Sequence, residues 1–405
     1  MSTDSTQDTR PGLAIVAPTQ ERYRHALHRR IVHEIPEFRL HSIYTHSAGA
    51  VYRNKRPESD INAVFFDTGE PTTERQSLKN QFRNYQRGRK IFKYLCDNNI
   101  RAAIILGYND IGLLHLFSTA HRSGVRLFLW ADSNAAGDHA TGLKRYLKNR
   151  IIRFVDNHTD FIFTCGSLGE NFYRDYGVSS DKIRYSPCEP DYGLINTIGQ
   201  ESIAAVRDQY GLDPRRKRFV FCGRLVNNKR PDLALETFLK IADDRPLWDL
   251  VLIGDGPERS RLESMIPDIL KHRVTFTGFL DDQVKVSAIY RICDILVHPC
   301  DYEPWGLIIN EAAASGLAII TTSSCGSGVE LVEDGKSGFL IDPGDAASLK
   351  NAMLVISKDD NAETFKARSR QMLQSWRHRA DPVRAIRKAL HDVGLLPDPA
   401  HTEKP

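Results

Sequence analysis

Two cations follow an apolar stretch in the second half of the chain and precede a predicted helix. Residues 219–223 predict a strand, Arg224 and Lys229 come just after it, and a helix is predicted over 231–244. Pro231 suits the first turn of that helix, where a missing N–H costs nothing. A guanidinium fork and a mobile ammonium group, beside the free amides of a helix N-terminus, suit a diphosphate. Two surface cations in a loop would give the same pattern, so both interpretations stay open at this point.

A second group of polar residues surrounds the start of a later helix. Glu303 lies in the loop after a predicted strand, and Glu311 lies about one turn into the helix that follows. Gly306 and Leu307 open this helix with amides that have no partner inside it. One carboxylate can bind sugar hydroxyls, the other can take vicinal ribose hydroxyls, and the amides between them can hold a phosphate. The helix dipole alone also favours an acid near the N-terminus, so Glu311 has a purely structural alternative.

Short apolar runs alternate with amphipathic stretches along the chain, which is typical of parallel sheets with crossover helices. Strands are predicted at 13–17, 38–44, 61–66, 101–108, 126–132, 161–165, 219–223, 250–254, 274–278, 295–299, 317–321 and 338–342. Helices are predicted at 21–33, 79–98, 111–123, 141–155, 167–175, 231–244, 258–271, 284–292, 307–316 and 345–357. We therefore predict an α/β fold of two doubly wound, Rossmann-like domains with a crevice between the carboxyl ends of both sheets.

The limits of the two domains follow from breaks in this periodicity. Two prolines and a glycine interrupt the pattern over 185–193, which places an interdomain linker there. The expected units are a disordered N-terminus 1–12, a first domain 13–188, a linker 189–200, a second domain 201–380, a helix 381–395 that crosses back to the first domain, and a disordered tail 396–405.

The composition excludes several classes of protein. The 405 residues are 41% hydrophobic and 26% charged, which is ordinary for a globular protein and unlike collagen, coiled coils or disordered chains. No apolar run approaches the ~18–20 residues of a membrane span, and the polar N-terminus lacks the features of a secretory signal. We therefore expect a cytoplasmic protein. Seven scattered cysteines without a C-x-x-C spacing favour buried free thiols over a metal site or a disulfide framework.

Positive charge gathers in the first half of the chain. Residues 1–190 contain 27 Lys and Arg against 20 Asp and Glu, whereas the remainder contains 28 against 31. The basic segments 22–30, 79–93 and 143–154 interleave Arg and Lys with Phe and Tyr, which suits peripheral contact with anionic lipid at the inner face of the plasma membrane. A solvated basic face is the alternative, and no motif supports nucleic-acid binding.

Four stretches of the second half resemble one known family when they are taken together. They are FCGRLVNNKRPDLALETF (221–238), LVLIGDGPERSRLE (250–263), VTFTGFL (274–280) and the run from DYEPWG to DPGD (301–345). This combination resembles the donor-nucleotide domain of retaining GT-B glycosyltransferases of family 4. The likeness is continuous over about 215–345, weaker over 100–190, and slight over the first hundred residues.

The resemblance implies a reaction and a set of residues that perform it. A hexose would pass from a nucleotide sugar to a hydroxyl acceptor, with retention of the anomeric configuration. The acceptor would be a glycan or glycolipid intermediate of cell-envelope or exopolysaccharide synthesis. The first domain would bind this acceptor. Arg224 and Lys229 would neutralise the diphosphate, and Glu303 would hold the donor sugar. The implied donor-binding residues are Gly223, Arg224, Lys229, Gly254, Gly256, Phe279, Leu280, Glu303, Gly306, Leu307 and Glu311, of which Glu311 would bind the ribose.

The chain also departs from the family pattern. No D-x-D occurs, so we expect metal-independent transfer and no cofactor beyond the nucleotide-sugar substrate. The loop over 17–27 lacks the usual glycines, and Arg22 or Tyr23 is a candidate for the crevice edge instead. Near the reacting carbon, Asp132 and His139 are both candidates for a catalytic role, although a cap or loop hydrogen bond would also explain Asp132.

Two other functions were weighed against transfer. A dinucleotide-dependent oxidoreductase would share the sheet type, but no G-x-G-x-x-G follows the first strand of either domain. A non-catalytic sugar-nucleotide-binding or scaffold protein on a degenerate GT-B fold is the remaining alternative. The presence of both cations and both glutamates argues against it.

Overall fold

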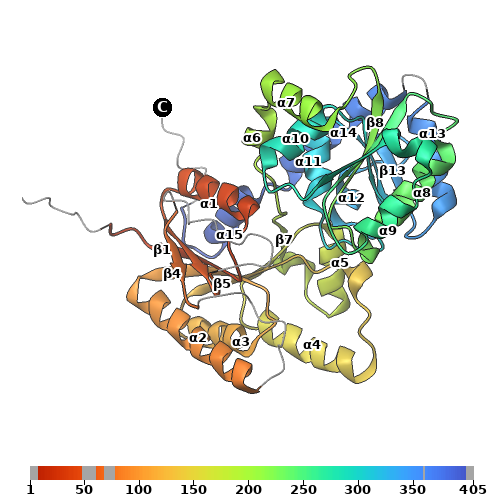
Figure 1. The fold of residues 1–405 in the computed structure, drawn as a ribbon. Helices are drawn as coiled ribbons and strands as arrows, with labels where there is room; N and C mark the ends of the chain where they lie inside the picture. The colour runs from red at the N-terminus through yellow and green to blue at the C-terminus, as the bar shows by residue number, and fades with distance from the viewer. Residues whose placement is uncertain (1–7, 48–60, 68–77, 359–360, 398–405) are drawn as a thin grey trace, which may run out of the picture.

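The computed structural model describes residues 8–47, 61–67, 78–358 and 361–397, which form two α/β domains (Figure 1). The strands of the first domain are β1 Gly12–Ala17, β2 Arg39–Tyr44, β3 Ala63–Phe65, β4 Ile100–Leu106, β5 Arg126–Ala131, β6 Phe161–Thr164 and β7 Ile183–Tyr185. The strands of the second domain are β8 Lys217–Cys222, β9 Trp248–Ile253, β10 Val274–Gly278, β11 Ile295–His298, β12 Ala318–Thr322 and β13 Gly338–Ile341.

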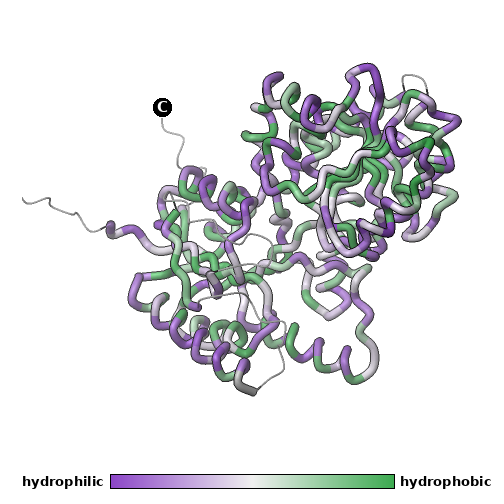
Figure 2. The backbone as a smooth tube through the Cα atoms, viewed as in Figure 1, coloured by the Kyte–Doolittle hydropathy of each residue, from purple (hydrophilic) through white to green (hydrophobic). Residues whose placement is uncertain are grey.

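Both sheets are parallel and doubly wound, as predicted. The strand order is β3-β2-β1-β4-β5-β6-β7 in the first sheet and β10-β9-β8-β11-β12-β13 in the second. The order reverses beside the first strand of each sheet, which is where such folds bind ligands. The apolar runs become strands because helices cover both faces of a parallel sheet, and Phe219, Val220 and Phe221 of β8 are accordingly fully buried. In Figure 2 the strands form the hydrophobic centre of each domain.

Helices of both domains connect the strands. Those of the first domain are α1 Arg22–Glu34, α2 Leu78–Asp97, α3 Ile111–Arg122, α4 Gly142–Asp156 and α5 Ser167–Asp175. Those that follow are α6 Tyr192–Asn196, α7 Gln200–Tyr210, α8 Pro231–Ile241, α9 Arg259–Ser264, α10 Gln283–Arg291, α11 Leu307–Ser315, α12 Gly326–Leu331, α13 Ala346–Ile356, α14 Asn361–Arg379 and α15 Pro382–Asp392. None of the helices in the described ranges is both long enough and apolar enough to span a membrane.

The chain passes between the two domains twice. After β7, helices α6 and α7 pack against α10 and α11 of the second domain. After α14, helix α15 returns to the first domain, where it packs against α1 and β7 and lies beside α1 in Figure 1. Residues 1–7 and 398–405 of the termini expected to be disordered lie outside the described residues.

Part of the predicted secondary structure is wrong. The single helix predicted over 258–271 is instead the short α9, followed by Pro267 and a 3₁₀-helix Asp268–Arg273. Proline lacks the N–H that would continue the helix, and its ring clashes with the preceding turn. The prediction also omitted β7, α6, α7, α12 and α14. All seven cysteines are free thiols, but Cys96 is exposed, whereas buried thiols were expected throughout.

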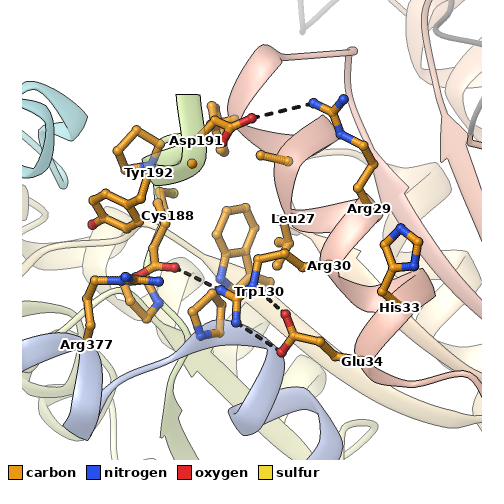
Figure 3. A pocket seen from close by; sticks show the side chains of 17 residues that line it. Leu27, Arg29, Arg30, His33, Glu34, Trp130, Cys188, Asp191, Tyr192 and Arg377 are labelled. Carbon is orange, nitrogen blue, oxygen red and sulfur yellow. Dashed lines mark hydrogen bonds and ion pairs between the residues drawn. The ribbon is translucent and has the colours of Figure 1, made fainter. Parts of the chain in front are cut away.

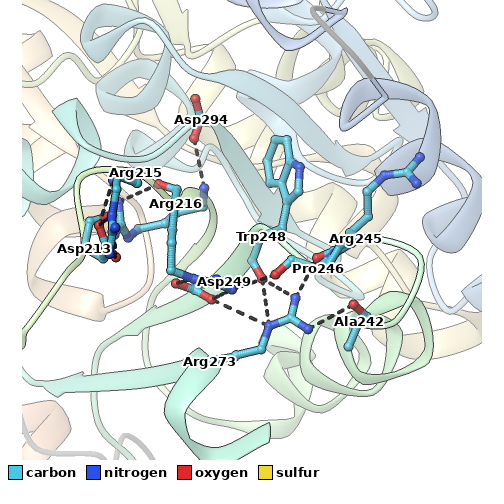
Figure 4. A network of polar contacts seen from close by, with 11 residues as sticks. Asp213, Arg215, Arg216, Ala242, Arg245, Pro246, Trp248, Asp249, Arg273 and Asp294 are labelled. Atoms are coloured by element: carbon cyan, nitrogen blue, oxygen red, sulfur yellow. Dashed lines mark hydrogen bonds and ion pairs between the residues drawn. The ribbon is translucent and has the colours of Figure 1, made fainter.

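The amino edge of the second sheet carries a network of charged side chains (Figure 4). The Asp249 carboxylate receives two hydrogen bonds of 2.7 Å from Arg216 and lies 3.7 Å from Arg273 Nε. Arg273 also donates to the carbonyl oxygens of Ala242, Arg245 and Trp248. This network holds the 3₁₀-helix before β10 against the start of β9.

Candidate active site

The loops that follow β8, β9 and β10 touch one another through their backbones. The Gly254 amide donates to the Gly278 carbonyl oxygen at 3.0 Å. A Cβ on Gly254 would lie 1.9 Å from the carbonyl oxygen of Gly223, and one on Gly256 would lie 2.4 Å from that of Leu225. Only glycine allows this approach, which brings three predicted donor-binding segments to one edge of the sheet.

An ion pair joins the loops that follow β8 and β11. The Lys229 ammonium donates to Oε2 of Glu303, and the two side chains are only 13% and 18% exposed. The Asp301 amide also donates to the Asn228 carbonyl oxygen at 3.0 Å. Burial alone would raise the pKa of Glu303, but His298 and Lys229 outweigh it and hold that pKa below its usual range. Glu303 is therefore held in its ionised form, in which both carboxylate oxygens accept hydrogen bonds.

Helix α11 begins immediately after this ion pair. Gly306 caps it with φ of 96°, and a Cβ there would lie 3.0 Å from both the Glu303 Cγ and the Cys325 Sγ. Of the amides of the first turn, that of Ile309 donates to the Gly306 carbonyl oxygen at 3.0 Å, whereas that of Leu307 has no carbonyl partner inside the helix. This turn therefore offers backbone donors and the positive end of the helix dipole next to Glu303.

Glu311 lies in the same helix and has an unusual acidity. Burial raises the pKa of its carboxyl to about 7, although a hydrogen bond with Gln283 opposes the shift. The carboxylate interacts electrostatically with Cys222, the last residue of β8. Glu311 therefore lies beside the strand that leads into Arg224.

Arg224 and Phe279 are exposed at this edge. The Arg224 guanidinium makes no hydrogen bond or ion pair with any residue that the structure describes. Phe279 is 54% exposed, while its neighbour Leu280 is partly buried against the core. A cation without a partner and an open aromatic face are thus available to a ligand that approaches the loops.

The first domain reaches this edge through a residue that the sequence did not indicate. The Asn134 side-chain amide, buried, donates to the carbonyl oxygens of Glu303, Pro304 and Ser324 at 3.2, 3.3 and 3.3 Å. Its Oδ1 accepts a hydrogen bond of 2.8 Å from the Ala136 amide. Asn134 therefore fixes the loop after β5 against the loop that carries Glu303.

Asp132 lies two residues earlier, opposite Glu303. The residue is exposed, but desolvation of its carboxyl group raises its pKa, and the charge of Glu303 adds to this shift while Arg24 opposes it. Of the other first-domain candidates, Arg22 crosses between the domains, with Nη2 3.8 Å from Asp281 Oδ2. His139 is exposed and makes no hydrogen bond or ion pair with these residues.

The sequence of the second half of the chain matches a known protein family. Residues 202–388 match the family described as glycosyl transferases group 1. This part of the chain belongs to that family. The GDP-mannose-dependent alpha-mannosyltransferase of Corynebacterium glutamicum is 28% identical to this chain over 199 residues. The matched region covers 47% of this chain and 42% of that protein. The chain spans about half the length of the curated relatives it matches.

Solved structures extend the likeness to both domains. HepE of Anabaena, solved in complex with UDP, matches with a TM-score of 0.69 at 16% identity, over 95% of this chain and all of that one. Sucrose-phosphate synthase of Thermosynechococcus elongatus gives 0.70 at 17% identity, over 95% and 99%. These matches confirm the GT-B fold that the resemblance implied.

A cavity of about 390 Å³ lies where the chain crosses between the domains (Figure 3). Tyr23, the other candidate of the loop after β1, lines this cavity. Beside it, Arg30 of α1 lies 3.1 Å from Glu189 and 2.7 Å from Asp381, while Arg377 of α14 donates to Glu189 at 3.0 Å. These ion pairs tie both crossings to α1.

Two more contacts between the domains were missed by sequence reasoning. The Trp305 indole donates to the Cys188 carbonyl oxygen at 2.8 Å, and Glu330 accepts a hydrogen bond of 2.7 Å from the Ser167 amide. Both lie in the stretch 301–345, which the resemblance assigned to donor binding alone. No periodicity or spacing signals such contacts, because each joins residues more than a hundred positions apart.

Proposed function

We propose that this protein is a retaining glycosyltransferase that moves a hexose from a nucleotide sugar to a hydroxyl acceptor. One observation carries the proposal: Arg224, the Lys229–Glu303 pair and the first-turn amides of α11 gather at one sheet edge. The carboxylates of Asp132 and Glu303 interact across the two domains at the same place. A diphosphate would bind the cations and amides, and the sugar it carries would then lie between the two carboxylates.

The proposed chemistry depends on stabilising the leaving group. The bond between the anomeric carbon and the phosphate oxygen breaks, and its electron pair stays on the nucleoside diphosphate. Arg224, Lys229 and the helix amides are already in place to stabilise that charge, so little reorganisation accompanies bond cleavage. The acceptor oxygen attacks the face that the phosphate leaves, and its proton passes to the departing phosphate oxygen. Asp132 would orient the acceptor hydroxyl, while Glu303 would hold the donor sugar.

No metal ion is needed in this scheme, because two cations perform the usual task of a divalent ion at the diphosphate. Addition of EDTA should therefore leave the transfer rate undiminished. A large loss of rate on chelation, restored by Mg²⁺ or Mn²⁺, would contradict metal independence.

A ligand panel tests the donor class. HepE was solved with UDP, and the Corynebacterium relative is named for GDP-mannose, so UDP, GDP, ADP and their sugars are the compounds to compare. A nucleotide that binds only the folded protein raises its melting temperature by mass action. We expect one base to stand out, and the matching nucleotide sugar to be slowly hydrolysed. Binding without hydrolysis or transfer would instead support the scaffold alternative.

We further propose that the acceptor is lipid-linked and that α4 contacts anionic lipid on the cytoplasmic face of the plasma membrane. Leu143, Tyr146 and Leu147 of α4 are 72%, 59% and 53% exposed, and Figure 2 shows apolar and polar residues mixed along this helix. Lys144 and Arg150 are exposed beside them. An exposed apolar stripe flanked by cations suits the headgroup region of an anionic bilayer.

The other basic segments expose fewer large apolar side chains than α4: among the described residues of 22–30 and 79–93, Phe82 of α2 is the only exposed one, at 63%. In α1, Arg24 is buried and Arg30 is held by three carboxylates. In α2, Arg87 is buried and lies 3.4 Å from Asp67. The membrane proposal therefore rests on α4.

Co-sedimentation with vesicles tests this contact. The protein should bind phosphatidylglycerol vesicles more than phosphatidylcholine vesicles, and Leu143→Ser with Leu147→Ser should reduce that binding. Leu247→Ser is a matched control, because Leu247 is 63% exposed in the second domain. Equal binding of the α4 variant and the control variant would rule out α4 as the contact.

A further inference from the structure

Three side chains that ligate soft metal ions meet beneath the proposed donor site. His298 ends β11, Cys300 follows two residues later, and Cys325 precedes α12. One ligand atom from each lies within 4.8 Å of the other two, and all three residues are buried. Because Cys325 is 25 positions from Cys300 in sequence, no short motif signals this cluster.

The register of two strands creates the cluster. Strands β11 and β12 are parallel neighbours, and His298 pairs with Thr321. Beyond the strand ends, Glu303 and Cys325 form an isolated parallel bridge. The two segments that carry the thiols are thus held side by side by backbone pairing, whatever the thiols themselves bind.

The histidine of the cluster has no hydrogen-bond partner. His298 is 1% exposed, and within the described part of the chain neither of its ring nitrogens makes a hydrogen bond. Buried polar groups are nearly always satisfied, so an orphaned imidazole calls for an explanation. The nearest carboxylate oxygen is Oε2 of Glu303, 3.7 Å from Nε2.

We propose that His298, Cys300 and Cys325 bind a thiophilic divalent cation such as Zn²⁺, with Glu303 as the fourth ligand. Zinc takes four such ligands in a tetrahedron with edges of about 3.3–3.8 Å, so the present spacing needs to contract by only about 1 Å. Two thiolates and an imidazole select zinc over magnesium or calcium. The ion would enter past Glu303, the one member of the set whose side chain is partly exposed.

Binding would change the proposed donor site directly. Glu303 is paired with Lys229 in the structure, and a carboxylate that ligates zinc is no longer available to Lys229 or to a donor sugar. Zinc should therefore inhibit transfer. This consequence rests on the proposed function, whereas metal binding itself does not.

Cobalt spectroscopy of the full, reduced chain tests the binding. Co²⁺ added after removal of metals should give the d–d bands of tetrahedral coordination and the charge-transfer band of thiolate ligands, and Zn²⁺ should abolish both. Each of Cys300→Ser and Cys325→Ser should remove about half of the charge-transfer intensity, since one thiolate of the two remains. Cys293→Ser is the control, because Cys293 is buried in the same domain outside the cluster. Absent bands, or bands that persist in the double variant, would overturn the proposal.

A second measurement needs no variant. Zn²⁺ that binds the folded state should raise the melting temperature of the wild-type chain, and Mg²⁺ at the same concentration should not. An unchanged melting temperature would also overturn the site. In a transfer assay, Zn²⁺ should inhibit the wild type reversibly and leave the double cysteine variant active. If the enzyme is active and binds zinc without being inhibited, Glu303 is excluded as a ligand. If cobalt bands appear but the protein is inactive with every donor, only the proposed function is refuted.

Discussion

In the second sheet, charged side chains at the amino ends of the strands (the amino edge) are paired differently from those at the carboxyl ends (the carboxyl edge). At the amino edge, Asp249 is held by Arg216 and Arg273, and Arg273 also donates to three backbone carbonyls (Figure 4). At the carboxyl edge, Arg224 has no partner among the described residues, and burial raises the pKa of Glu311 to about 7. The charges of the amino-edge network are therefore paired with one another, whereas the carboxyl edge combines the Lys229–Glu303 pair with a cation that has no partner among the described residues.

This difference separates charges that hold the fold from charges that await a ligand. A buried charge without compensation is costly, which is why the pKa of Glu311 is raised, whereas the unpaired Arg224 is exposed to water. The amino edge needs nothing from outside the chain. The carboxyl edge lacks an anion for Arg224 and for the Leu307 amide of α11, and the proposed diphosphate would supply it. Substitutions at the two edges should consequently change different quantities.

The largest effect is expected on stability, at the amino edge. Arg273→Ala removes a side chain that is 8% exposed, together with its hydrogen bonds to three carbonyl oxygens and its ion pair with Asp249. We expect a loss of about 3 kcal/mol in the free energy of unfolding, with kcat/KM unchanged per folded molecule. Urea denaturation measures the first quantity and initial rates the second.

Arg215→Ala is the control for that variant. Arg215 is 87% exposed and pairs with Asp213 near the same edge, and an exposed pair contributes less than about 1 kcal/mol. Equal destabilisation by both variants would mean that the network at the amino edge has no special structural weight.

The next effect is expected on catalysis, at the carboxyl edge. Arg224→Ala should lower kcat/KM by about 10–100-fold, because one charge-assisted contact to the leaving group contributes about 1.5–3 kcal/mol. The melting temperature should stay that of the wild type, since the exposed guanidinium makes no hydrogen bond or ion pair with a described residue. Arg224→Lys keeps the positive charge but not the bidentate guanidinium, so its kcat/KM should lie between those of the wild type and the alanine variant. Full activity in the alanine variant would refute a phosphate role for Arg224.

A smaller effect is expected where the first domain meets this edge. Asn134→Ala removes the donor shared by the carbonyls of Glu303, Pro304 and Ser324. We expect kcat to fall about fivefold, equivalent to about 1 kcal/mol, with donor affinity nearly unchanged because Asn134 positions the loop and does not contact the diphosphate. Asn134→Asp keeps the oxygen that accepts from the Ala136 amide but loses the N–H donor, so its kcat should fall as much as that of Asn134→Ala. A variant with normal kcat and weakened donor binding would contradict this positioning role.

The same comparison explains what the sequence could predict. Arg224, Lys229, Glu303 and Glu311 each lie in a continuous strand–loop–helix stretch, where local pattern fixes which sheet edge a residue occupies. The helix predicted over 258–271 was wrong because Pro267 interrupts it, a local signal that was overlooked.

Other features depend on geometry that no local pattern encodes. Asn134 acts on a loop about 170 positions away, so its role exists only once the domains meet. The His298, Cys300 and Cys325 cluster depends on the register of β11 with β12. The amino-edge network likewise joins side chains from three elements. Sequence therefore predicted which residues gather at the carboxyl edge, and tertiary contacts decide which of its charges remain unpaired.

The smallest predicted effect is the release of a fraction of a proton when the donor binds. With a pKa of about 7 in the free protein, Glu311 is about half protonated at pH 7. Hydrogen bonds from ribose hydroxyls favour the charged carboxylate and lower this pKa, so binding should release up to about half a proton at pH 7 and less as the pH rises above 8. Calorimetry in buffers of different ionisation enthalpy measures the release. The ligand should be a nucleotide sugar, whose diphosphate does not titrate in this range, and Glu311→Gln should release none. Equal proton release by wild type and variant would place the titrating group elsewhere and remove the argument that Glu311 binds the ribose.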